Sequence, residues 1–441
     1  MEVKGLKTVV VGMQKSGIAA VEFLTRRGAE VRATDLKPLD QLPQARELLD
    51  RLGVAFAQQS PAVFEGCDLV VISPDVPADL PILRGLRTIG EVELAGPYLR
   101  GRTIGITGSN GKTTTTSLVG HILREAGVPV QVGGNIGAAV CGMVETSRDD
   151  GWNVLELSSF QLETIAEFRA HIALALNVTQ NHLDRHHTFE NYANAKARLF
   201  ETQRAGDFAV LNADDPVTAS YAQRTAATPL WFSSSHKVTP GAHLCADKLV
   251  LEGKLLMAAS EIPIRGRHNV ENVLAASIAA SRAGVDHQAI AAAVRSFRAV
   301  EHRLEFVRNV SGIDFYNDSK ATSVDATLKA LDAFPGGLWV ILGGKDKGLD
   351  YAALREPLAA KAHAVLLIGA AAGKIAEQLR GAVPLVDAQT LDGAIAHAYN
   401  AGSRGDTVLL APACASFDQF RSYEHRGEVF KQLVNQLDPK E

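Results

Sequence analysis

The chain has few of the residues that mark a disulfide-stabilised, zinc-binding or membrane-embedded protein. Its four cysteines, Cys67, Cys141, Cys245 and Cys414, lie far apart with no C-x-x-C spacing, which argues against a disulfide framework and a thiolate zinc site. No apolar run reaches the roughly 20 residues of a transmembrane helix, and the run near the first residue is too short for a signal peptide. We therefore expect a cytoplasmic protein without membrane insertion.

A surplus of positive charge is also missing. The chain has 45 Lys and Arg residues against 49 Asp and Glu residues, a net charge of −4. Proteins that bind the nucleic-acid backbone normally carry a basic surplus, so no nucleic-acid partner is expected. What is present is the composition of a globular protein, 46% hydrophobic and 21% charged, in a chain of 441 residues, long enough for about three domains.

Apolar stretches alternate with helix-forming stretches throughout, which predicts an α/β fold with parallel strands. We expect a Rossmann-like N-terminal domain at 1–96, a central P-loop ATPase-like domain at 97–298 and a Rossmann-like C-terminal domain at 299–441. The central domain should carry an added β-rich patch at 231–264. The predicted strands are 8–11, 31–34, 69–73, 103–106, 153–157, 173–177, 313–316, 339–342, 365–368 and 407–410.

Residues 107–116 read TGSNGKTTTT and lie between a predicted strand and a predicted helix. Gly108 and Gly111 permit a turn whose N–H groups surround phosphate oxygens, Lys112 adds charge near the β and γ phosphates, and Thr113 offers a hydroxyl to Mg²⁺. Ile106 stands where the usual motif has its first glycine, so the loop is a shorter G-x-x-G-K-T variant. The segment predicts a nucleoside triphosphate site, with an ordinary strand-to-helix turn as the alternative.

Further polar segments in the central block also follow predicted strands. Glu156 ends a strand in ELSSFQ, and His182 lies in NVTQNHLDRH just past the next one. Because parallel strands share a carboxyl edge, Glu156 is a candidate Mg²⁺ ligand and His182 a candidate for a second metal position. Lys196, in the helical stretch NAKAR, is interpreted from residue type alone as a solvated lysine.

The first block carries a weaker ligand-binding pattern. Its first strand is followed by GMQKSG at residues 12–17, and Asp35 ends its second strand, as in a dinucleotide-binding unit. Gln14 occupies the place of the middle glycine, where a side chain hinders close approach to a pyrophosphate. A nicotinamide cofactor is therefore disfavoured, which leaves another phosphate-bearing or uridine ligand, or a structural turn.

The third block has polar loops after three predicted strands, NDSKATS at 317–323, GGKDKG at 343–348 and ACASFDQF at 413–420. Loops at one sheet edge suggest a binding face, although each taken alone is as well explained as a plain turn. The segments His268-Asn269 and Glu301-His302-Arg303, at the ends of the central block, are candidates for capping or surface charge.

Set side by side, these segments resemble the motifs of the Mur ligase family over essentially the whole chain. The motifs are TGSNGKTT, ELSSFQLE, NVTQNHLDRH, NAKARLF, GRHN, EHR, NDSKAT, GGKDKG and PACASFDQF. NDSKAT and PACASFDQF are most similar to the D-glutamate-adding members. The resemblance implies an ATP-dependent amide ligase of peptidoglycan synthesis that adds D-glutamate to UDP-N-acetylmuramoyl-L-alanine through an acyl phosphate. It also implies ATP and two Mg²⁺ ions as cofactors, and we expect a monomer.

The resemblance assigns roles to individual residues. Lys112, His182 and Lys196 would be catalytic, and Lys196 would become a Mg²⁺ ligand once carbamylated, beside Thr113, Glu156 and His182. The residues implied for ATP are Gly108, Ser109, Asn110, Gly111, Lys112, Thr113, Thr114, Asn269, Arg303 and Asp318. Those implied for the UDP-sugar are Ser16, Asp35, Lys37, Ser73 and Asn135. Those implied for D-glutamate are Thr322, Lys347, Ser416 and Tyr423.

The chain departs from the family pattern at Gln14 and Lys15 in the first turn and at Asp75, where the family usually has glycine. These departures concern only the UDP-sugar. Three other functions remain open: another amide ligase of the superfamily, such as the L-alanine-adding enzyme or folylpolyglutamate synthase, an NAD-dependent dehydrogenase built on the first block, and a non-catalytic nucleotide-binding or scaffold protein. The last would leave Glu156, His182 and Lys196 without a purpose.

Overall fold

The computed structural model describes residues 2–298 and 300–440, so Ala299, at the expected boundary between the central and C-terminal domains, lies outside the described residues. The chain divides into two compact units. The first runs to Glu261 and includes Glu271–Arg295, and the second comprises Ile262–Val270 and the residues from Ser296 onward. In the part of the chain that the structure describes, no helix is long and apolar enough to cross a membrane.

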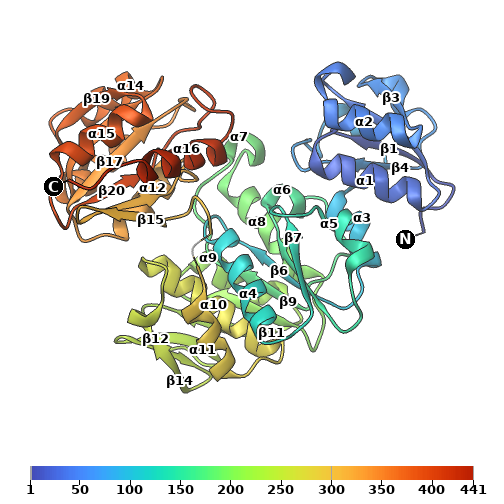
Figure 1. Ribbon diagram of the computed structural model, residues 1–441. Coiled ribbons are helices and arrows are strands. Elements are labelled where there is room, and N and C mark those ends of the chain that lie inside the picture. The colour runs from blue at the N-terminus through green and yellow to red at the C-terminus, as the bar shows by residue number, and fades with distance from the viewer. Residues whose placement is uncertain (1, 299, 441) are drawn as a thin grey trace. The chain divides into compact units, whose positions relative to one another are not determined.

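The N-terminal sheet has the strand order β3-β2-β1-β4-β5 and is parallel throughout. Its strands are β1 (Lys7–Val11), β2 (Glu30–Asp35), β3 (Ala55–Gln58), β4 (Leu69–Ile72) and β5 (Thr88–Gly90). The helices α1 (Lys15–Arg26) and α2 (Pro43–Leu52) pack against it, and α3 (Glu91–Ala95) follows β5 (Figure 1). Every residue of β4 is buried, as expected for a parallel strand covered on both faces.

The central sheet has the order β14-β13-β12-β11-β10-β9-β6-β8-β7, parallel from β7 to β12 and antiparallel beyond. Its parallel strands are β6 (Arg102–Thr107), β7 (Val130–Gly134), β8 (Trp152–Glu156), β9 (Ile172–Ala175), β10 (Phe208–Asn212), β11 (Thr228–Ser233) and β12 (Gly241–Cys245). The strands β13 (Lys248–Leu251) and β14 (Lys254–Ala258) complete the predicted β-rich patch.

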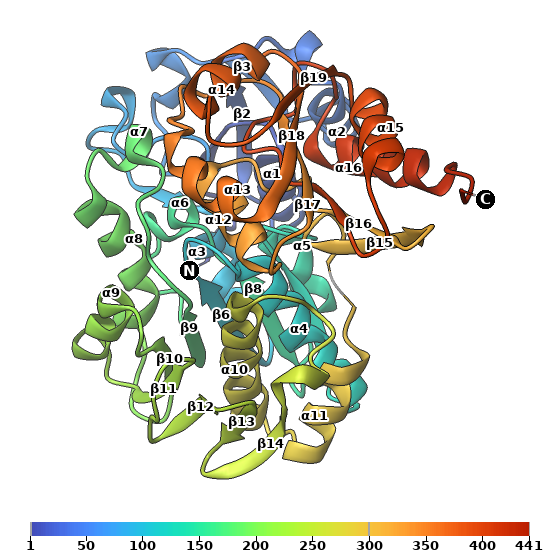
Figure 2. The same cartoon turned by 90° about the vertical axis from the view of Figure 1, so that its left-hand side faces the viewer.

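The first unit carries helices on both faces of this sheet. They are α4 (Lys112–Glu125), α5 (Val140–Met143), α6 (Ser159–Leu162), α7 (Leu183–His186), α8 (Phe189–Glu201), α9 (Pro216–Ser220), α10 (Arg267–Arg282) and α11 (His287–Ser296). Figure 2 shows α8 and α9 on one side of the sheet and α4 and α10 on the other. Helix α10 begins in the second unit and continues in the first.

The sheet of the second unit has the order β15-β16-β20-β17-β18-β19, with only β15 running antiparallel to its neighbour. Its strands are β15 (Glu305–Val310), β16 (Ile313–Asn317), β17 (Leu338–Gly343), β18 (Ala362–Ile368), β19 (Leu385–Gln389) and β20 (Thr407–Leu410). Its helices are α12 (Val324–Asp332), α13 (Arg355–Lys361), α14 (Ala372–Leu379), α15 (Leu391–Ala401) and α16 (Tyr423–Asn435).

Alternate residues of these strands enter different cores. Val340 and Leu342 of β17 belong to the cluster under α12, α13 and α14, whereas Ile341 belongs to the cluster under α15 and α16. This follows from the two-residue period of a strand, and it makes the unit a sheet between two helical layers. The predicted α/β class is confirmed, with a sheet in each of the three predicted domains.

The carboxyl ends of β6, β8 and β9 come together at one edge of the central sheet. Ile106 pairs with Glu156 on one side, and Thr107 pairs with Ala175 on the other. The segments that follow these strands are therefore neighbours, although they are separated by about 50 and 70 residues in the chain. This edge is where an open parallel sheet binds its ligands.

Candidate active site

The segment between β6 and α4 has the predicted strand-loop-helix geometry. Gly108 and Gly111 adopt positive φ angles of 149° and 83°, which side chains rarely adopt. A Cβ on Gly111 would also lie 2.4 Å from the Asn272 Oδ1. Glycine is therefore required at position 111 both by its backbone conformation and by the close approach of α10.

Side chains from the next strand end fix the shape of this loop. The Ser109 N–H donates to the Asn177 carbonyl (2.8 Å), and the Ser109 hydroxyl lies 3.0 Å from both the Thr179 carbonyl and the Tyr192 hydroxyl. The Asn110 N–H donates to the Asn177 Oδ1 (2.9 Å), and the Asn177 amide donates back to the Asn110 carbonyl (3.2 Å). The loop is thus held by the segment after β9.

Two lysines converge on this loop. The Lys112 Nζ donates to the carbonyl oxygens of Gly108 (2.8 Å) and Ser109 (3.0 Å). The Lys196 Nζ, which comes from α8, donates to the same Gly108 carbonyl (2.9 Å). The predicted catalytic lysines therefore meet at one oxygen atom.

The interpretation of Lys196 as a solvated lysine is wrong, because its side chain is only 1% exposed. It lies on the inward stripe of α8 with Tyr192, whose ring centroid is 4.5 Å from Nζ, and with Leu199. Burial lowers the pKa of Lys196 well below its ordinary value, the charge of Lys112 lowers it further, and Glu156 opposes this change. The spacing of 192, 196 and 199 would have revealed the burial, since it is the spacing of one helix face.

Glu156 lies at the end of β8, and the described contacts give a hydrogen-bond partner to one of its two carboxylate oxygens and none to the other. Its Oε1 accepts from the Asn135 side-chain amide (2.8 Å), and its backbone carbonyl accepts from the Asn135 N–H (2.9 Å). Among the described residues, no group hydrogen-bonds the buried Oε2. A buried carboxylate oxygen of this kind suits a cation, which would offset the cost of burying it.

His182 also lies at this edge, at the N-cap of α7, with a left-handed φ of 53°. Its ring packs against Phe160 (5.0 Å between centroids) and Tyr192 (6.2 Å). Thr113 is buried in the first turn of α4. No cluster of three or more His, Cys, Asp or Glu side chains that would hold a metal is present in residues 2–298 or 300–440.

The N-terminal domain forms a second polar edge, at the turn before α1. The Asp35 carboxylate accepts from the Met13 N–H (2.7 Å) and from the Lys37 N–H (2.9 Å). Ser16 lies in the first turn of α1, beside this carboxylate-braced turn. Three of the residues predicted for the UDP-sugar are thus grouped at the carboxyl ends of β1 and β2.

Ser73 and Asn135 join the same region from other segments. The Ser73 hydroxyl donates to the Gly12 carbonyl (2.7 Å), and a Cβ on Gly17 would lie 1.8 Å from that oxygen. The Lys15 ammonium donates to the Gly137 carbonyl, two residues beyond Asn135. Lys15, one of the departures from the family pattern, therefore ties the first turn to the loop that carries Asn135.

The remaining residues predicted for ATP lie in the second unit. Asn269 is buried and donates to the Arg265 carbonyl (2.6 Å), and His302, beside Arg303, is buried as well, so neither Asn269 nor His302 is a surface residue. Burial raises the pKa of Asp318 to about 7, against the opposing charge of Arg303. Asp318 and Arg303 are therefore electrostatically coupled within this unit.

The residues predicted for D-glutamate come from neighbouring loops of the second unit. The Lys347 Nζ donates to the Thr322 carbonyl (3.2 Å), which joins GGKDKG to NDSKATS. The Lys345 N–H donates to the Ala415 carbonyl (2.8 Å), beside the buried Ser416. The Ser319 hydroxyl donates to the Tyr423 carbonyl (2.8 Å) at the start of α16. The structure thus joins the loops and the start of α16 that carry these four residues.

Sequence reasoning missed Arg426, which joins these loops from α16. Its fully buried guanidinium donates to the Ser319 hydroxyl (3.0 Å) and carbonyl (2.8 Å) and to the Cys414 carbonyl (3.2 Å), and it contacts the Gly343 carbonyl at 3.5 Å. One side chain therefore reaches all three polar loops. Burial lowers the pKa of Arg426 to about 10, so it stays charged at neutral pH.

Three family models match successive parts of the chain. They are described as "Mur ligase MurD-like, N-terminal domain" (residues 6–94), "Mur ligase middle domain" (106–280) and "Mur ligase, glutamate ligase domain" (302–414). Each match contains one of the three sheets or most of it. The described motifs therefore lie within matched segments, apart from the first residue of EHR and the last residues of PACASFDQF.

Curated proteins resemble the chain over its full length. It is 77% identical over 446 residues to the UDP-N-acetylmuramoylalanine--D-glutamate ligase of Solibacter usitatus, with 100% of each chain covered. It is 53% identical over 447 residues to the ligase of that name from Acidobacterium capsulatum, with 98% of this chain and 97% of the relative covered.

Solved structures resemble the chain in fold. A pseudomurein peptide ligase type C from Methanothermus fervidus has a TM-score of 0.61 at 16% identity, covering 98% of this chain and 100% of that one. A UDP-N-acetylmuramate-alanine ligase from Thermotoga maritima has a TM-score of 0.61 at 18% identity, covering 98% and 99%. At these identities the likeness concerns the fold alone.

Proposed function

The chain belongs to the Mur ligase family, and on this premise we propose that it is an ATP-dependent ligase that joins D-glutamate to UDP-N-acetylmuramoyl-L-alanine in peptidoglycan synthesis. The observation that carries the proposal is the full-length identity of 77% with a ligase of that name. The phosphate loop, the orphan carboxylate oxygen of Glu156 and the loops joined by Arg426 support it, since an amide ligase needs a triphosphate site and an amino-acid site.

The reaction proceeds in two steps on the substrates. The carboxylate of the alanyl group attacks the γ-phosphorus of ATP, which breaks the bond to ADP and forms an acyl phosphate. The amine of D-glutamate then attacks the acyl carbon, and the tetrahedral intermediate collapses to the amide with loss of phosphate. Lys112, with the N–H groups of the loop and of the first turn of α4, stabilises the charge that builds up on the γ-phosphoryl group.

The residues present fit Mg²⁺, which when bound would neutralise triphosphate charge. Glu156 offers its unpartnered Oε2, and Thr113 offers a hydroxyl at the start of α4. Mg²⁺ takes few protein ligands and is completed by phosphate oxygens and water, which agrees with the absence of a larger acidic or imidazole cluster in the described residues. We assign a second Mg²⁺ to His182.

We assign Lys196 the role of a carbamylated Mg²⁺ ligand. Carbamylation requires a neutral amine that attacks CO₂ through nitrogen and releases a proton. The buried setting of Lys196, with Lys112 as a like charge nearby, lowers its pKa and so favours that neutral amine. The resulting carbamate would carry a negative charge, which is better suited than an ammonium to a place beside Lys112.

The grouped residues of each domain support the substrate assignments. Ser16, Asp35, Lys37, Ser73 and Asn135 would bind the UDP-sugar, and Thr322, Lys347, Ser416 and Tyr423 would bind D-glutamate. ATP would be held by residues 108–114 and by Asn269, Arg303 and Asp318. With the domains divided at 96/97 and 298/299, the residues for the UDP-sugar and for ATP each come from two domains, because Asn135 lies in the central domain and Arg303 and Asp318 lie in the C-terminal domain. We also propose that the protein is cytoplasmic, since its four cysteines are free thiols, and that it is a monomer.

The test is phosphate release from ATP in the presence of UDP-N-acetylmuramoyl-L-alanine and a panel of D- and L-amino acids. With UDP-N-acetylmuramoyl-L-alanine present, we expect phosphate release with D-glutamate and with no other amino acid of the panel. Release with L-alanine on the unsubstituted UDP-N-acetylmuramate would indicate the L-alanine-adding enzyme instead. No release with any acceptor, from a folded protein that binds ATP, would contradict the proposal and favour a non-catalytic nucleotide-binding protein.

A further inference from the structure

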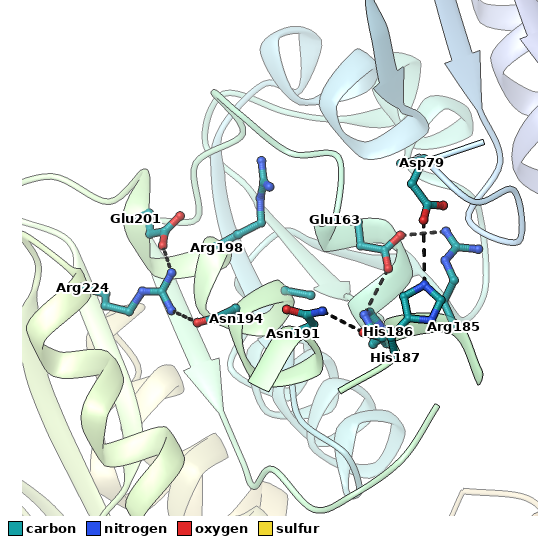
Figure 3. Close-up of a pocket in the computed structure, with 12 residues that line it drawn as sticks. Asp79, Glu163, Arg185, His186, His187, Asn191, Asn194, Arg198, Glu201 and Arg224 are labelled. Carbon is teal, nitrogen blue, oxygen red and sulfur yellow. Dashed lines mark hydrogen bonds and ion pairs between the residues drawn. The ribbon is translucent and has the colours of Figure 1, made fainter. Parts of the chain in front are cut away.

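Arg185 of α7 reaches from the central domain to the loop after β4 (Figure 3). Its Nη2 donates to the Glu163 Oε2 (2.7 Å) and to the Val76 carbonyl (2.9 Å). Longer contacts join its guanidinium to the carbonyl oxygens of Asp75 (3.3 Å) and Pro74 (3.5 Å). One side chain thus binds three successive carbonyl oxygens of the N-terminal domain.

The guanidinium is enclosed rather than solvated. The Arg185 side chain is 12% exposed and the Glu163 side chain is 19% exposed. The guanidinium carbon lies 5.0 Å from the centre of the Phe160 ring, and the second oxygen of Glu163 lies 3.2 Å from the His186 Nδ1. An enclosed, charge-assisted pair with several carbonyl acceptors fixes its geometry far more firmly than an exposed ion pair does.

The bound loop leads directly to the residues proposed for the UDP-sugar. Ser73 precedes Pro74 and donates to the Gly12 carbonyl (2.7 Å). A Cβ on Gly12 would lie 2.9 Å from the Ser73 Cβ and 3.0 Å from the Val76 Cγ2. The 73–76 loop and the turn before α1 are therefore in close contact, and a shift of one moves the other.

On the other side, Arg185 connects to the edge where chemistry is proposed. It lies three residues after His182, and the Phe160 ring beneath it also packs against the His182 ring. Glu163 belongs to ELSSFQLE, the segment that begins with Glu156. Arg185 therefore connects the loop after β4, in the N-terminal domain, to the two segments of the central domain that carry Glu156 and His182.

We propose that Arg185 is a positioning residue for the nucleotide-sugar substrate. It holds the 73–76 loop at a fixed place relative to the carboxyl edge of the central sheet, so that the acceptor carboxylate is delivered to the γ-phosphate of ATP. The inference rests on the function proposed above. Because Arg185 binds carbonyl oxygens, the contact does not depend on the residue type at position 75, which agrees with an exposed Asp75 where the family usually has glycine.

The pocket beside Arg185 supplies a matched control. Arg224 contacts Glu201 and donates to the Asn194 Oδ1 (2.6 Å) in the same pocket, of about 420 Å³, but reaches no residue of the 73–76 loop in its described contacts (Figure 3). Each arginine is thus paired with a glutamate, Arg185 with Glu163 after α6 and Arg224 with Glu201 at the end of α8. They differ in that Arg224 is more exposed than Arg185 (35% against 12%) and, in its described contacts, does not bridge two domains.

The experiment measures the KM of each substrate for Arg185→Ala, Arg185→Lys, Glu163→Gln and Arg224→Ala. We expect Arg185→Ala to raise the KM for UDP-N-acetylmuramoyl-L-alanine about 10- to 100-fold, since charge-assisted hydrogen bonds to the loop are lost. The KM values for ATP and D-glutamate should stay within about threefold. Arg185→Lys should be nearly as impaired, because an ammonium cannot reproduce the planar fork. Arg224→Ala should resemble the wild type.

Two measurements separate positioning from a general loss of structure. Calorimetric binding of UDP-N-acetylmuramoyl-L-alanine without ATP should weaken by the same factor as the KM rises, and binding of ATP should not weaken. Glu163→Gln keeps the arginine and its carbonyl contacts, so a smaller rise, about 3- to 10-fold, is expected. If Arg185→Ala does not fold, Arg185→Lys and Glu163→Gln decide the matter.

The outcomes are distinguishable from failure of the proposed function. A wild type without D-glutamate-dependent phosphate release overturns the function. An active wild type, together with Arg185 variants whose KM for the nucleotide-sugar stays within twofold, overturns the inference. An equal rise in the KM for all three substrates also overturns it, because displacement of the 73–76 loop would not weaken the binding of ATP and D-glutamate to the same extent.

Discussion

A single carbonyl oxygen, that of Gly108, accepts hydrogen bonds from both Lys112 and Lys196. Two ammonium groups this close repel each other, and burial penalises the one on α8 most, so its pKa falls. The two lysines are therefore not equivalent, because burial and the charge of Lys112 favour the neutral form of Lys196. Residue types alone do not give this difference, because it arises from where α8 lies.

The first prediction concerns the cation. Lys112→Ala should lower kcat at saturating ATP by about 100- to 1,000-fold, because a charge aimed at the transferring phosphoryl group is removed. Phosphate release under initial-rate conditions measures it, with the exposed Lys254→Ala as the control. Wild-type turnover in Lys112→Ala would disprove the assignment of the phosphate loop.

The second prediction concerns the buried amine. Lys196→Ala should be nearly inactive and should regain part of its activity in millimolar acetate, because a small carboxylate can take the place of a carbamate as a Mg²⁺ ligand. Phosphate release as a function of acetate concentration measures the recovery. Lys112→Ala, which lacks a cation and not a carboxylate, should gain nothing. Absence of rescue in Lys196→Ala would count against carbamylation.

The sequence could predict that certain site residues lie at the carboxyl ends of strands. It could predict only some of the residues whose hydrogen bonds hold those site residues in place. The placement of Glu156, His182 and the phosphate loop at one edge follows from strand ends alone. The bonds of Ser109 with Asn177 and Tyr192 join positions about 70 and 80 residues apart through side-chain and backbone oxygens. No local pattern records such pairs, so they could not have been read from the chain.

At the scale of elements, α16 organises the loops of the second unit through Arg426. Its described partners are oxygen atoms of neutral groups, on the loops that begin after β16, β17 and β20. Such a charge is costly to bury, and its hydrogen bonds to carbonyl oxygens offset that cost. Arg426 is the side chain that contacts all three loops, beside the pairwise bonds of Lys347 with Thr322 and of Lys345 with Ala415, so we expect the proposed D-glutamate site to depend on it.

The third prediction tests that dependence. Arg426→Met should lower the free energy of unfolding by about 2–4 kcal/mol, since the carbonyls of Ser319 and Cys414 lose a buried donor. Arg426→Lys should fold better and still raise the KM for D-glutamate about tenfold or more, because an ammonium cannot reach all three loops. Urea unfolding and substrate kinetics provide the measurements, with the exposed Arg421→Met as the control. An unchanged KM for D-glutamate would contradict this role.

Helix α3 joins the N-terminal domain to the central domain, because the carboxylates of its Glu91 and Glu93 accept hydrogen bonds from backbone N–H groups of the central domain. The Glu93 carboxylate accepts from the N–H groups of Ala166 (2.9 Å), Glu167 (2.8 Å) and Phe168 (3.0 Å). Glu91 accepts from the Cys141 N–H (2.5 Å) through one oxygen, and in the described residues its other oxygen has no hydrogen-bond partner. Burial raises the pKa of Glu91 to about 7.

The fourth prediction follows from that pKa. Between about pH 4.5 and 7 the folded protein holds a proton on Glu91 that the unfolded chain has released, so the unfolding free energy should fall as the pH rises, by up to about 3 kcal/mol, and then level off. Glu91→Gln cannot ionise and should lack this loss. Urea unfolding of both proteins at pH 5 and pH 8 measures the difference. The prediction would be contradicted if the difference in unfolding free energy between Glu91→Gln and the wild type did not increase from pH 5 to pH 8. It would also be contradicted if Glu190→Gln showed the same increase.

The strands that sequence missed are mostly edge strands. β3, β5, β7, β15 and β19 each lie at the border of a sheet, where residues are partly exposed and the apolar pattern is weak. The central strands, such as β4 and β20, read as unbroken apolar runs and were predicted at nearly the right bounds. β10 is the exception, a buried central strand overlooked between two helices.

At the scale of the whole molecule, the residues proposed for ATP are divided between the two units. The phosphate loop belongs to the first unit, whereas Asn269, Arg303 and Asp318 belong to the second. A ligand that engages both sets favours conformations in which they face each other. We therefore expect the units to close on the substrates before reaction, with the segment near Arg303 as a hinge.

The fifth prediction is that ligands compact the protein. Small-angle scattering with a non-hydrolysable ATP analogue and UDP-N-acetylmuramoyl-L-alanine should give a smaller radius of gyration than scattering without ligands. Lys112→Ala, which should bind the analogue weakly, serves as the comparison. Superimposable curves with and without ligands, at concentrations where calorimetry shows binding, would contradict closure.

The division at Glu261, Val270 and Arg295 means that the chain passes between the units three times, once within α10. The second unit is consequently not formed by one continuous segment at the C-terminal end of the chain. A fragment starting at residue 296 would lack the nine-residue segment Ile262–Val270, which belongs to the second unit and includes the start of α10. Exchange of amino-acid specificity between relatives by grafting this unit must therefore transplant two pieces of chain, not one.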